Sequence, residues 1–524
     1  MTYLAVPISA ESPNEARRQI GDALDAGAEV LELRTDYLQP LRPGMVVDLI
    51  GEVRALGPAH ARVLVTCRDP EEGGAGMHPE PRRIEVLLAA LEAGADFIDF
   101  EYANFTERGN DEKIRTALAE HPKSRLILSA HNFQGRFKNI GWGYEDIRST
   151  CPEAIPKLVY TANHINDCFE AFDLLAETDG DRIVLCMGEA GLISRILAKK
   201  LGSFLTFASL SERAATAPGQ LTIAALKRLY RYDSIDDETE LFGVIADPVA
   251  HSLSPAIHNA CFAEAGMNRL YLPLLVQGSE SKFNAFLDHI IERPWLDFGG
   301  FSVTIPHKHS ALKYAQRPGG SVEPLAEKIG AANTLVLRLR AADADGPVAA
   351  YNTDYAGALD AITDGMGIER EQLRDIHVAI VGAGGVARAI VAGLRDAGAR
   401  VTIYNRTVER ARALAMEFGC EVTDLDGLSW LDAKLLINGT SVGMHPEVNA
   451  TPVPPERLRA DMAVFDTIYN PAETLLLKQA REKGAKTIDG VSMFVNQAAA
   501  QFRLFTGQEA DTDLMRRVVV RNLQ

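Results

Sequence analysis

The sequence is poor in cysteine and has no long hydrophobic run. Its six cysteines are scattered over 524 residues, without a Cys-x-x-Cys pair or a Cys/His cluster of zinc spacing, so we predict no disulfide framework and no metal site. No stretch approaches the roughly 20 apolar residues of a membrane-spanning helix. The first apolar run, at 4–8, is too short for a secretion signal and follows no basic segment. We therefore expect a cytoplasmic protein without a membrane partner, or a plastid protein whose transit segment has been removed.

Positive charge is in deficit as well. The chain has 54 Lys and Arg against 71 Asp and Glu, a formal net charge of −17. This balance argues against nucleic acid or an anionic membrane as a partner, and it leaves small molecules as the expected ligands. An anionic substrate would need a local cluster of Arg or Lys, because the overall field opposes it. An oligomer is compatible with the sequence but is not indicated by it.

What the chain does have is enough apolar material for several cores. Hydrophobic residues make up 47% and charged residues 24%, which is typical of soluble globular proteins. In the first 210 residues, apolar and β-branched runs alternate with helical patterns, two of which end in Ala-Gly-Ala, with the glycine at a plausible C-cap. The runs lie at 4–9, 30–36, 62–68, 97–102, 125–132, 156–162, 182–188 and 204–209. The alternation also allows an open doubly wound sheet, but the count of eight favours a closed (β/α)8 barrel over 1–229.

The second half predicts a different α/β architecture after an acidic linker at 230–240. A strand at 241–247 opens a substrate domain over 241–356, which we expect helices in 490–524 to complete. A strand, a glycine-rich turn and a helix at 377–394 then begin a Rossmann-type domain over 357–489. Its further strands are expected at 401–405, 435–440, 463–469 and 486–490.

Polar side chains occur at the ends of the predicted barrel strands, where catalytic groups of such barrels gather. These residues are Glu32, Arg34, Arg68, Glu72, His131, Lys157, Ser194, Arg195 and those from Thr216 to Gln220. Lys157 lies between apolar neighbours within a strand. On the inner face its amine would be desolvated, which favours the neutral form that attacks a carbonyl to give a Schiff base. The alternative is a lysine at a strand mouth with its ammonium in water.

Six motifs in this half, in order, resemble type I 3-dehydroquinate dehydratase. They are ELR (32–34), TCRDPEEGG (66–74), SAHNF (129–133), PKLV (156–159), GLISR (191–195) and APGQ (217–220). The resemblance implies that Lys157 forms an imine with the C3 ketone of 3-dehydroquinate, and that His131 removes the C2 proton and later delivers protons. Glu72 would orient His131.

The same resemblance implies the substrate contacts of the barrel. Glu32, Arg34 and Arg68 would hold the ring hydroxyls, and Arg195 with Gln220 would hold the carboxylate. Members of the family carry Ser where this chain has Thr216; the hydroxyl is retained, so Thr216 stays in the predicted site.

A glycine-rich loop in the second half predicts a dinucleotide site. Gly382, Ala383, Gly384, Gly385, Val386 and Ala387 fit G-x-G-x-x-A between a strand and a helix, the context that this motif requires. After the next strand the chain reads Asn405, Arg406, Thr407, with no acid for the ribose hydroxyls. This favours NADP over NAD. The alternative is that Arg406 caps a helix or meets solvent.

A further set of polar residues precedes this loop. Ser252, Ser254, Lys308, Asn333 and Asp354 could each singly be a surface residue, and Lys308 follows a strand that we expect to end at Pro306. Together with INGTSVGM (437–444), DTIYNPAETLLL (466–477) and DGVSMFVNQAAAQF (489–502), they resemble shikimate dehydrogenase over 240–524.

The resemblance implies that Lys308 is the acid/base on the reacting oxygen and that Asp354 holds it. Ser252 and Ser254 would bind the substrate carboxylate. The rest of the substrate site would be lined by Thr304, Asn333, Tyr469 and Gln497. Many bacterial members have Asn where this chain has Ser302, whereas fused plant-type members carry Ser.

The two resemblances together predict a fused enzyme of the shikimate pathway. It would dehydrate 3-dehydroquinate to 3-dehydroshikimate and reduce that product to shikimate with NADPH. One alternative is a preference for quinate, which differs by one hydroxyl near Ser252 and Thr304. Another is a non-enzymatic regulatory relative, against which the presence of Lys157, His131, Lys308 and Asp354 argues.

Overall fold

The protein, seen in a computed structural model that describes residues 2–107, 109–339 and 346–523, divides into two compact units. The first comprises Met1–Thr239 with Leu274–Gly278 and Ala285–His289, and the second comprises Glu240–Pro273, Ser279–Asn284 and Ile290–Gln524. Among the described residues, no helix combines the length and apolar character that crossing a membrane requires.

The first unit is the predicted barrel. Its eight strands pair in the order β7-β6-β5-β4-β3-β2-β1-β8, and the pairings along this order are parallel. At the seam between the end strands, Phe204 N donates to Arg182 O at 2.7 Å, which nearly closes the sheet. The strands are β1 (Tyr3–Ile8), β2 (Val30–Arg34), β3 (Arg62–Thr66), β4 (Phe97–Glu101), β5 (Arg125–Asn132), β6 (Ile155–Thr161), β7 (Ile183–Met187) and β8 (Leu205–Phe207). The expectation of eight strands is therefore confirmed.

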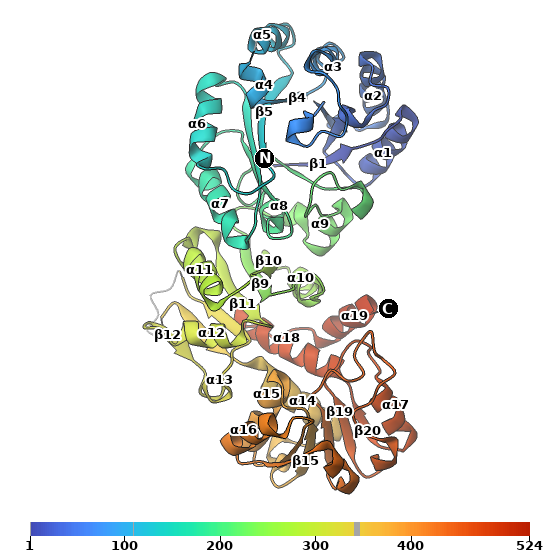
Figure 1. Ribbon diagram of the computed structural model, residues 1–524, viewed down its shortest axis with the longest axis vertical. Helices are drawn as coiled ribbons and strands as arrows, with labels where there is room; N and C mark the ends of the chain where they lie inside the picture. The colour runs from blue at the N-terminus through green and yellow to red at the C-terminus, as the bar shows by residue number, and fades with distance from the viewer. Residues whose placement is uncertain (1, 108, 340–345, 524) are drawn as a thin grey trace. The chain divides into compact units, whose positions relative to one another are not determined.

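Helices surround these strands on the outside (Figure 1). They are α1 (Pro13–Asp25), α2 (Pro43–Leu56), α3 (Glu80–Glu92), α4 (Tyr102–Thr106), α5 (Asn110–Glu120), α6 (Ile140–Thr150), α7 (Cys168–Glu177), α8 (Leu192–Ile196) and α9 (Ile223–Leu229). In α1, Ser12 caps the first turn, Pro13 occupies the first helical position, and Ala16, Ile20 and Ala23 form the buried face. An apolar cluster with residues from every strand fills much of the interior.

The second unit begins with a mixed sheet in the order β10-β9-β11-β13-β14-β12. Its strands are β9 (Glu240–Ala246), β10 (Arg269–Leu275), β11 (Phe298–Val303), β12 (Gly320–Val322), β13 (Thr334–Leu337) and β14 (Val348–Tyr351). The helices in this part of the chain are α10 (Ser254–Glu264), α11 (Glu280–Ile291), α12 (Lys308–Ala315), α13 (Pro324–Ile329) and α14 (Thr353–Met366).

The strand before Lys308 ends at Val303, and the expectation that it reaches Pro306 is wrong. Proline has no amide hydrogen to donate to a neighbouring strand, so a sheet ladder does not continue through it. The intervening turn carries a cis Ile305–Pro306 bond, and Lys308 opens α12.

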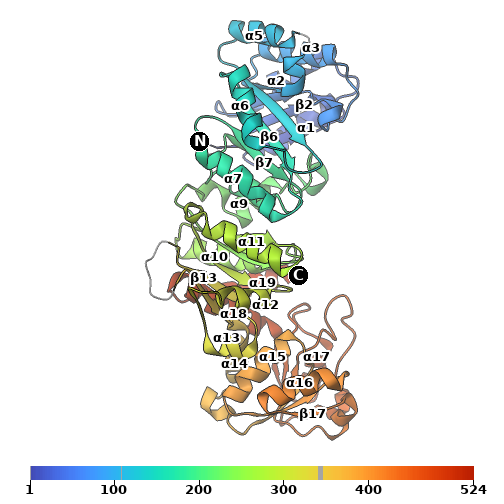
Figure 2. The ribbon, with the colours of Figure 1, turned by 60° about the vertical axis from the view of Figure 1, so that its left-hand side comes forward.

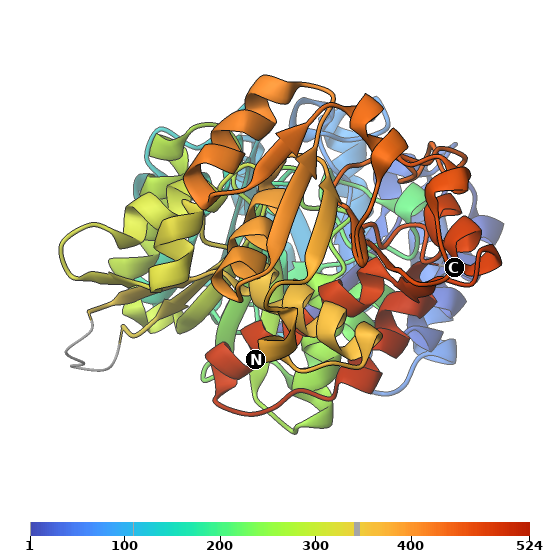
Figure 3. The same cartoon turned by 90° about the horizontal axis from the view of Figure 1, so that it is seen from below.

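The other sheet of this unit is parallel, in the order β17-β16-β15-β18-β19-β20, as a Rossmann-type domain requires. Its strands are β15 (His377–Val381), β16 (Arg400–Tyr404), β17 (Glu421–Thr423), β18 (Leu435–Asn438), β19 (Ala463–Asp466) and β20 (Lys486–Ile488). One face packs against α14, α15 (Gly385–Asp396) and α16 (Val408–Phe418), and the other against α17 (Leu475–Glu482). Figure 3 shows these orange strands between orange helices and red segments.

The C-terminal helices α18 (Gly490–Thr506) and α19 (Thr512–Leu523) complete the second unit. Helix α18 packs on α14, and the views of Figures 1 and 2 agree on this. Gly357 permits the close approach, since a Cβ there would lie 2.7 Å from the backbone nitrogen of Gln497. This contact brings Gln497 near the start of α14, where Asp354 lies.

Candidate active sites

One pocket of the barrel is lined by every site residue predicted in this half. These are Glu32, Arg34, Arg68, Glu72, His131, Lys157, Arg195, Thr216 and Gln220. Ser194, also noted in the sequence, does not line it: its hydroxyl donates to Gly191 O and accepts from Cys186 N, each at 2.8 Å. The pocket thus combines cations, carboxylates, an imidazole and an amine.

Lys157 points inward from β6 and is 4% exposed. Its Nζ lies 2.7 Å from Oδ2 of Asp99 and 4.8 Å from the centre of the Phe207 ring. The amine therefore has a carboxylate partner on β4 that the sequence did not reveal. The ion pair holds Nζ in the pocket, where a bound carbonyl compound would meet it.

His131 and Glu72 form a second pair in the pocket. Glu72 is the last residue of a 3-10 turn after β3, and its Oε2 lies 2.8 Å from Nδ1 of His131 and accepts from the His131 backbone at 3.1 Å. Burial raises the pKa of Glu72 to about 7, against the opposing charge of Arg68. Burial, with the cations Arg68 and Lys157, lowers the pKa of His131 well below its usual range. The imidazole is therefore neutral at neutral pH and can act as a base.

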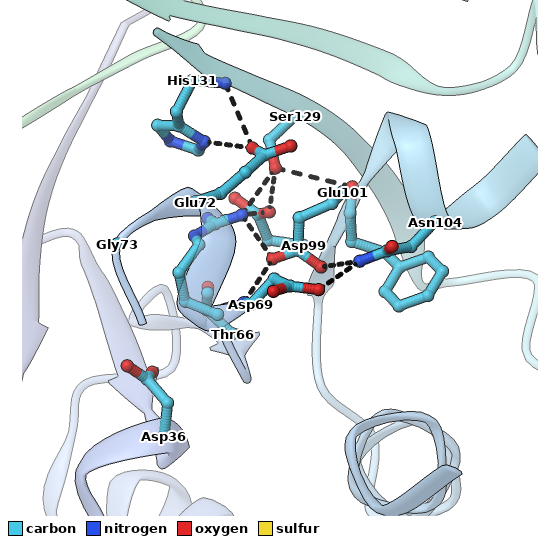
Figure 4. A network of polar contacts seen from close by, with 12 residues as sticks. Asp36, Thr66, Asp69, Glu72, Gly73, Asp99, Glu101, Asn104, Ser129 and His131 are labelled. Carbon is cyan, nitrogen blue, oxygen red and sulfur yellow. Dashed lines mark hydrogen bonds and ion pairs between the residues drawn. The ribbon is translucent and has the colours of Figure 1, made fainter. Parts of the chain in front are cut away.

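A buried network of charges supports both pairs (Figure 4). Arg68 bonds to Asp99, Glu101 and Ser129 at 2.9, 2.9 and 2.7 Å. Burial alone would raise the pKa of Asp99, but the cations of Arg68 and Lys157 hold it well below its usual range. Since Asp99 contacts Arg68 and Lys157 together, it links the amine to the rest of the site.

The same network fixes the loop that carries Glu72. Glu101 accepts from the Asp69 backbone at 3.0 Å, and Arg83 of α3 bonds to Glu101 and Asp69 at 2.8 and 2.5 Å. Asn104 adds a 2.6 Å bond to Asp69, as Figure 4 shows. The start of the loop is thereby anchored to the buried charges.

The remaining acidic and basic groups of β2 also have partners. Arg34 makes a bidentate pair with Asp36 at 2.9 and 2.8 Å, and Glu32 accepts from the Thr66 hydroxyl at 2.8 Å. Both side chains lie on the same face of the strand and line the pocket, as their spacing predicts.

Arg195 is the exception among the pocket's arginines. It is 2% exposed, and among the described residues it has no ion-pair partner and its Nε has no hydrogen-bond acceptor. Burial lowers its pKa to about 10. Thr216 and Gln220, joined by a 2.8 Å bond, line the pocket with it, and Gly188 N donates to Pro218 O between the loops after β7 and β8. A buried cation without a counter-ion is suited to an anionic ligand.

The second unit has a pocket of its own, lined by every substrate residue predicted there. These are Ser252, Ser254, Thr304, Lys308, Asn333, Asp354, Tyr469 and Gln497. Lys308 Nζ lies 2.5 Å from Oδ2 of Asp354, and the Asn333 amide donates to the other carboxylate oxygen at 2.9 Å. The pair is partly buried, which leaves the amine accessible from the pocket.

The glycine-rich loop fits a dinucleotide. Gly382 has φ +112° and a Cβ there would lie 2.8 Å from Gly439 O, whereas the Cβ positions of Gly384 and Gly385 are open. Helix α15 begins without a side-chain cap, so its first N–H groups are free for a phosphate. Arg406 is exposed after β16 and has no ion-pair partner among the described residues, and Val386 also lines the pocket. The donor set suits a phosphorylated dinucleotide.

Several residues of both sites were missed from the sequence. Asp99 and Glu101 alternate along an apolar strand, a spacing that places both on one face and could have indicated them. Gln501 lines the second pocket and follows Gln497 by one helical turn, which was a usable signal.

Comparison with known proteins accounts for both halves. The family model for type I 3-dehydroquinase matches residues 4–237, and that for the shikimate dehydrogenase substrate binding domain matches 244–335. Models for shikimate / quinate 5-dehydrogenase and for the shikimate 5'-dehydrogenase C-terminal domain match 367–442 and 490–520.

Individual relatives span the whole chain or its second half. The chain is 36% identical to the bifunctional 3-dehydroquinate dehydratase/shikimate dehydrogenase, chloroplastic, of Arabidopsis thaliana, over 98% of this chain and 83% of that protein. It is 43% identical to the shikimate dehydrogenase (NADP(+)) of Methanosarcina mazei, over 54% of this chain and 99% of that protein. A solved shikimate 5-dehydrogenase from Thermus thermophilus, in complex with NADP(H) and shikimate, matches 54% of this chain and all of its own (100%), at 34% identity with a TM-score of 0.47.

Proposed function

The chain belongs to the family of bifunctional 3-dehydroquinate dehydratase/shikimate dehydrogenases, and we propose that its two pockets carry out the two reactions of that name. The barrel, which we assign to residues 1–229, dehydrates 3-dehydroquinate to 3-dehydroshikimate. After a linker at 230–240, the substrate domain (241–356 with 490–524) and the cofactor domain (357–489) reduce that product to shikimate with NADPH.

In the barrel, Lys157 is the nucleophile. Its amine attacks the C3 ketone, and loss of the carbonyl oxygen as water gives an imine between Nζ and C3. The adjacent Asp99 carboxylate stabilises the iminium, because its positive charge develops beside the carboxylate oxygen that lies 2.7 Å from Nζ.

His131 is the acid/base of the dehydration. The iminium acidifies the C2 hydrogen, which the neutral imidazole removes; the C1 hydroxyl then leaves with a proton as water. Glu72 fixes the tautomer by accepting from Nδ1–H, so that Nε2 faces the substrate. Hydrolysis of the imine releases 3-dehydroshikimate and restores the amine.

The charged side chains of the barrel pocket determine how the substrate binds there. Arg195, with Thr216 and Gln220, holds the carboxylate of the substrate, and a guanidinium is well suited to such bidentate contacts. Glu32, Arg34 and Arg68 face the ring hydroxyls. Arg34 and Arg68 reach the pocket with their own carboxylate partners in place, so they orient the substrate without adding an uncompensated charge.

In the second unit, Lys308 is the proton donor of the reduction. Gly382 to Ala387 at the start of α15, with Asn405, Arg406 and Thr407, would hold NADPH, which would supply a hydride when bound. Negative charge develops on the carbonyl oxygen, and the Lys308 ammonium, held by Asp354, protonates it. Ser252 and Ser254 bind the carboxylate, and Thr304, Asn333, Tyr469 and Gln497 line the rest of the substrate site.

The observation that carries the proposal is the buried Lys157 amine in a pocket with a neutral imidazole and Arg195, which has no ion-pair partner in the described part of the chain. Borohydride added with 3-dehydroquinate should reduce the imine and leave a stable adduct, which peptide mapping should find on Lys157. Lys157→Ala should lose the adduct and the dehydratase activity and keep reduction of 3-dehydroshikimate. An adduct on another lysine, or none, would contradict the assignment.

A further inference from the structure

A continuous run of hydrogen bonds joins the buried Tyr271 to Asp354 through the floor of the second pocket. Tyr271 on β10 contacts Ser302 on β11 at 2.5 Å, and Ser302 contacts Gln501 on α18 at 2.7 Å. Gln501 bonds to Thr334 at 3.1 Å, and Thr334 bonds to the Asn333 side chain at 2.9 Å. Asn333 then reaches Asp354 at 2.9 Å.

The direction of each bond is fixed by partners that can only donate or only accept. Gln501 Nε2 also faces the carbonyl oxygen of Asn333 at 3.3 Å, so Oε1 must face Ser302. Ser302 therefore donates to Gln501 and has to accept from Tyr271. Asn333 Oδ1 accepts from the Thr353 backbone at 2.7 Å, so Nδ2 must face Asp354. Every donor thus points from Tyr271 toward Asp354.

Tyr271 is firmly held at the start of this run. Asn259 of α10 bonds to both backbone groups of Tyr271, at 2.7 and 2.9 Å, and the His258 ring stacks on its ring at 4.4 Å. The side chain is fully buried, and burial raises the pKa of its hydroxyl, so the phenol keeps its proton. A phenylalanine would fill nearly the same space, so packing alone does not account for the hydroxyl.

We propose that Tyr271 is a positioning residue of the dehydrogenase, the terminal donor of a one-way hydrogen-bond chain that orients Asn333 and, through it, the Asp354 carboxylate toward Lys308. Hydrogen bonds aligned in one direction polarise one another, so the last donor in the chain is strengthened by the first. The role rests on the proposed function of Lys308 and Asp354 and extends it to a residue outside the pocket.

Tyr271→Phe removes the hydroxyl alone and keeps the ring on His258. We expect kcat for shikimate oxidation to fall about three- to tenfold, the effect of one neutral hydrogen bond, with KM for shikimate unchanged within about twofold. Ser302→Ala cuts the chain at the next residue, so adding Tyr271→Phe to it should cause no further loss. Tyr355→Phe is the matched control: it loses a 2.8 Å bond to Glu323 outside the chain and should keep its kcat.

A wild-type kcat in Tyr271→Phe, or a loss that recurs in full in the Ser302→Ala background, would overturn the proposal. NADPH binding measured by fluorescence reports whether the second unit is folded. If Tyr271→Phe fails to bind NADPH, Ser302→Ala alone decides, and a wild-type kcat there overturns the proposal. Asp354→Asn distinguishes failure of the proposed function from failure of the role of Tyr271. If Asp354→Asn leaves kcat intact, the proposed function of Lys308 and Asp354 fails. If Asp354→Asn is inactive and Tyr271→Phe is fully active, only the role of Tyr271 is refuted.

Discussion

Asp99 Oδ2 lies 2.7 Å from Nζ of Lys157, and the same carboxylate lies 2.9 Å from Arg68. The nucleophilic amine of the barrel is therefore one part of a buried charge network, and its environment depends on residues that never reach the substrate. Removing one partner of such a buried ion pair strongly destabilises the folded protein, because the other charge stays buried without compensation.

Asp99→Asn should impair both catalysis and stability of the barrel. It removes the charge that holds Lys157, so we expect the dehydratase kcat to fall by about tenfold or more, and the free energy of unfolding to fall by up to about 3–5 kcal/mol. Asp181→Asn, which breaks an exposed pair with Arg125, is the control and should change neither. Denaturant unfolding and steady-state rates measure the two effects. A wild-type dehydratase rate in Asp99→Asn would show that the ion pair between Asp99 and Lys157 does not contribute to catalysis.

The dehydratase should lose activity as the pH falls through about 7. Burial raises the pKa of Glu72 to about 7, so below that pH its carboxylate takes up a proton and ceases to accept from His131 Nδ1–H. In Glu72→Gln this acid-side inflection should disappear, because the amide does not titrate, and activity should be lower throughout. The measurement is kcat/KM against pH; the dehydrogenase profile, recorded on the same proteins, should be unchanged. An inflection that persists in Glu72→Gln would assign it to another group.

Arg406 should set the preference for NADPH. Charge-assisted bonds to a 2′-phosphate contribute about 1.5–3 kcal/mol each, so Arg406→Ala should raise KM for NADPH about tenfold or more. KM for NADH should hardly change, because that cofactor lacks the phosphate. Arg412→Ala, on the exposed side of α16, is the control. Equal use of NADPH and NADH by the unaltered protein would contradict the assignment.

Lys308 and Asp354 should behave as a unit. Lys308→Ala and Asp354→Ala are each expected to slow the turnover of bound 3-dehydroshikimate by several orders of magnitude, and the double variant should be little worse than either. NADPH binding, followed by fluorescence, should persist in all three. Small and additive losses would instead indicate two independent charges at the pocket edge.

The sequence predicted the repeating elements and the polar residues at their ends, because strand alternation and strand-end position are local features. Each barrel and substrate-site residue predicted for binding or catalysis lines one of the two pockets. Partners across the fold were not predictable in the same way. Asp99 lies in a strand whose apolar pattern does not show which amine it meets, and Ser302 meets a glutamine 199 residues away, a contact that no local pattern encodes.

The end of the strand before Lys308 was also mispredicted: the regular strand ends at Val303, although Thr304 N still donates to Ile245 O and Ile305 O accepts from Asp247 N. The residue pattern of the sequence indicates a buried strand but not the residue at which its regular pairing ends. The departure matters for the site, because the turn it creates lets Lys308 start α12 and face Asp354.

The most direct test of the account is to supply 3-dehydroquinate and NADPH to the purified chain and to follow NADPH oxidation together with the products. The unaltered protein should yield shikimate, Lys308→Ala should stop at 3-dehydroshikimate, and Lys157→Ala should leave 3-dehydroquinate untouched. A mixture of the two variants should again yield shikimate, because each retains one working pocket. Shikimate formed by either variant alone, or none formed by the unaltered chain, would contradict the assignment of one reaction to each pocket.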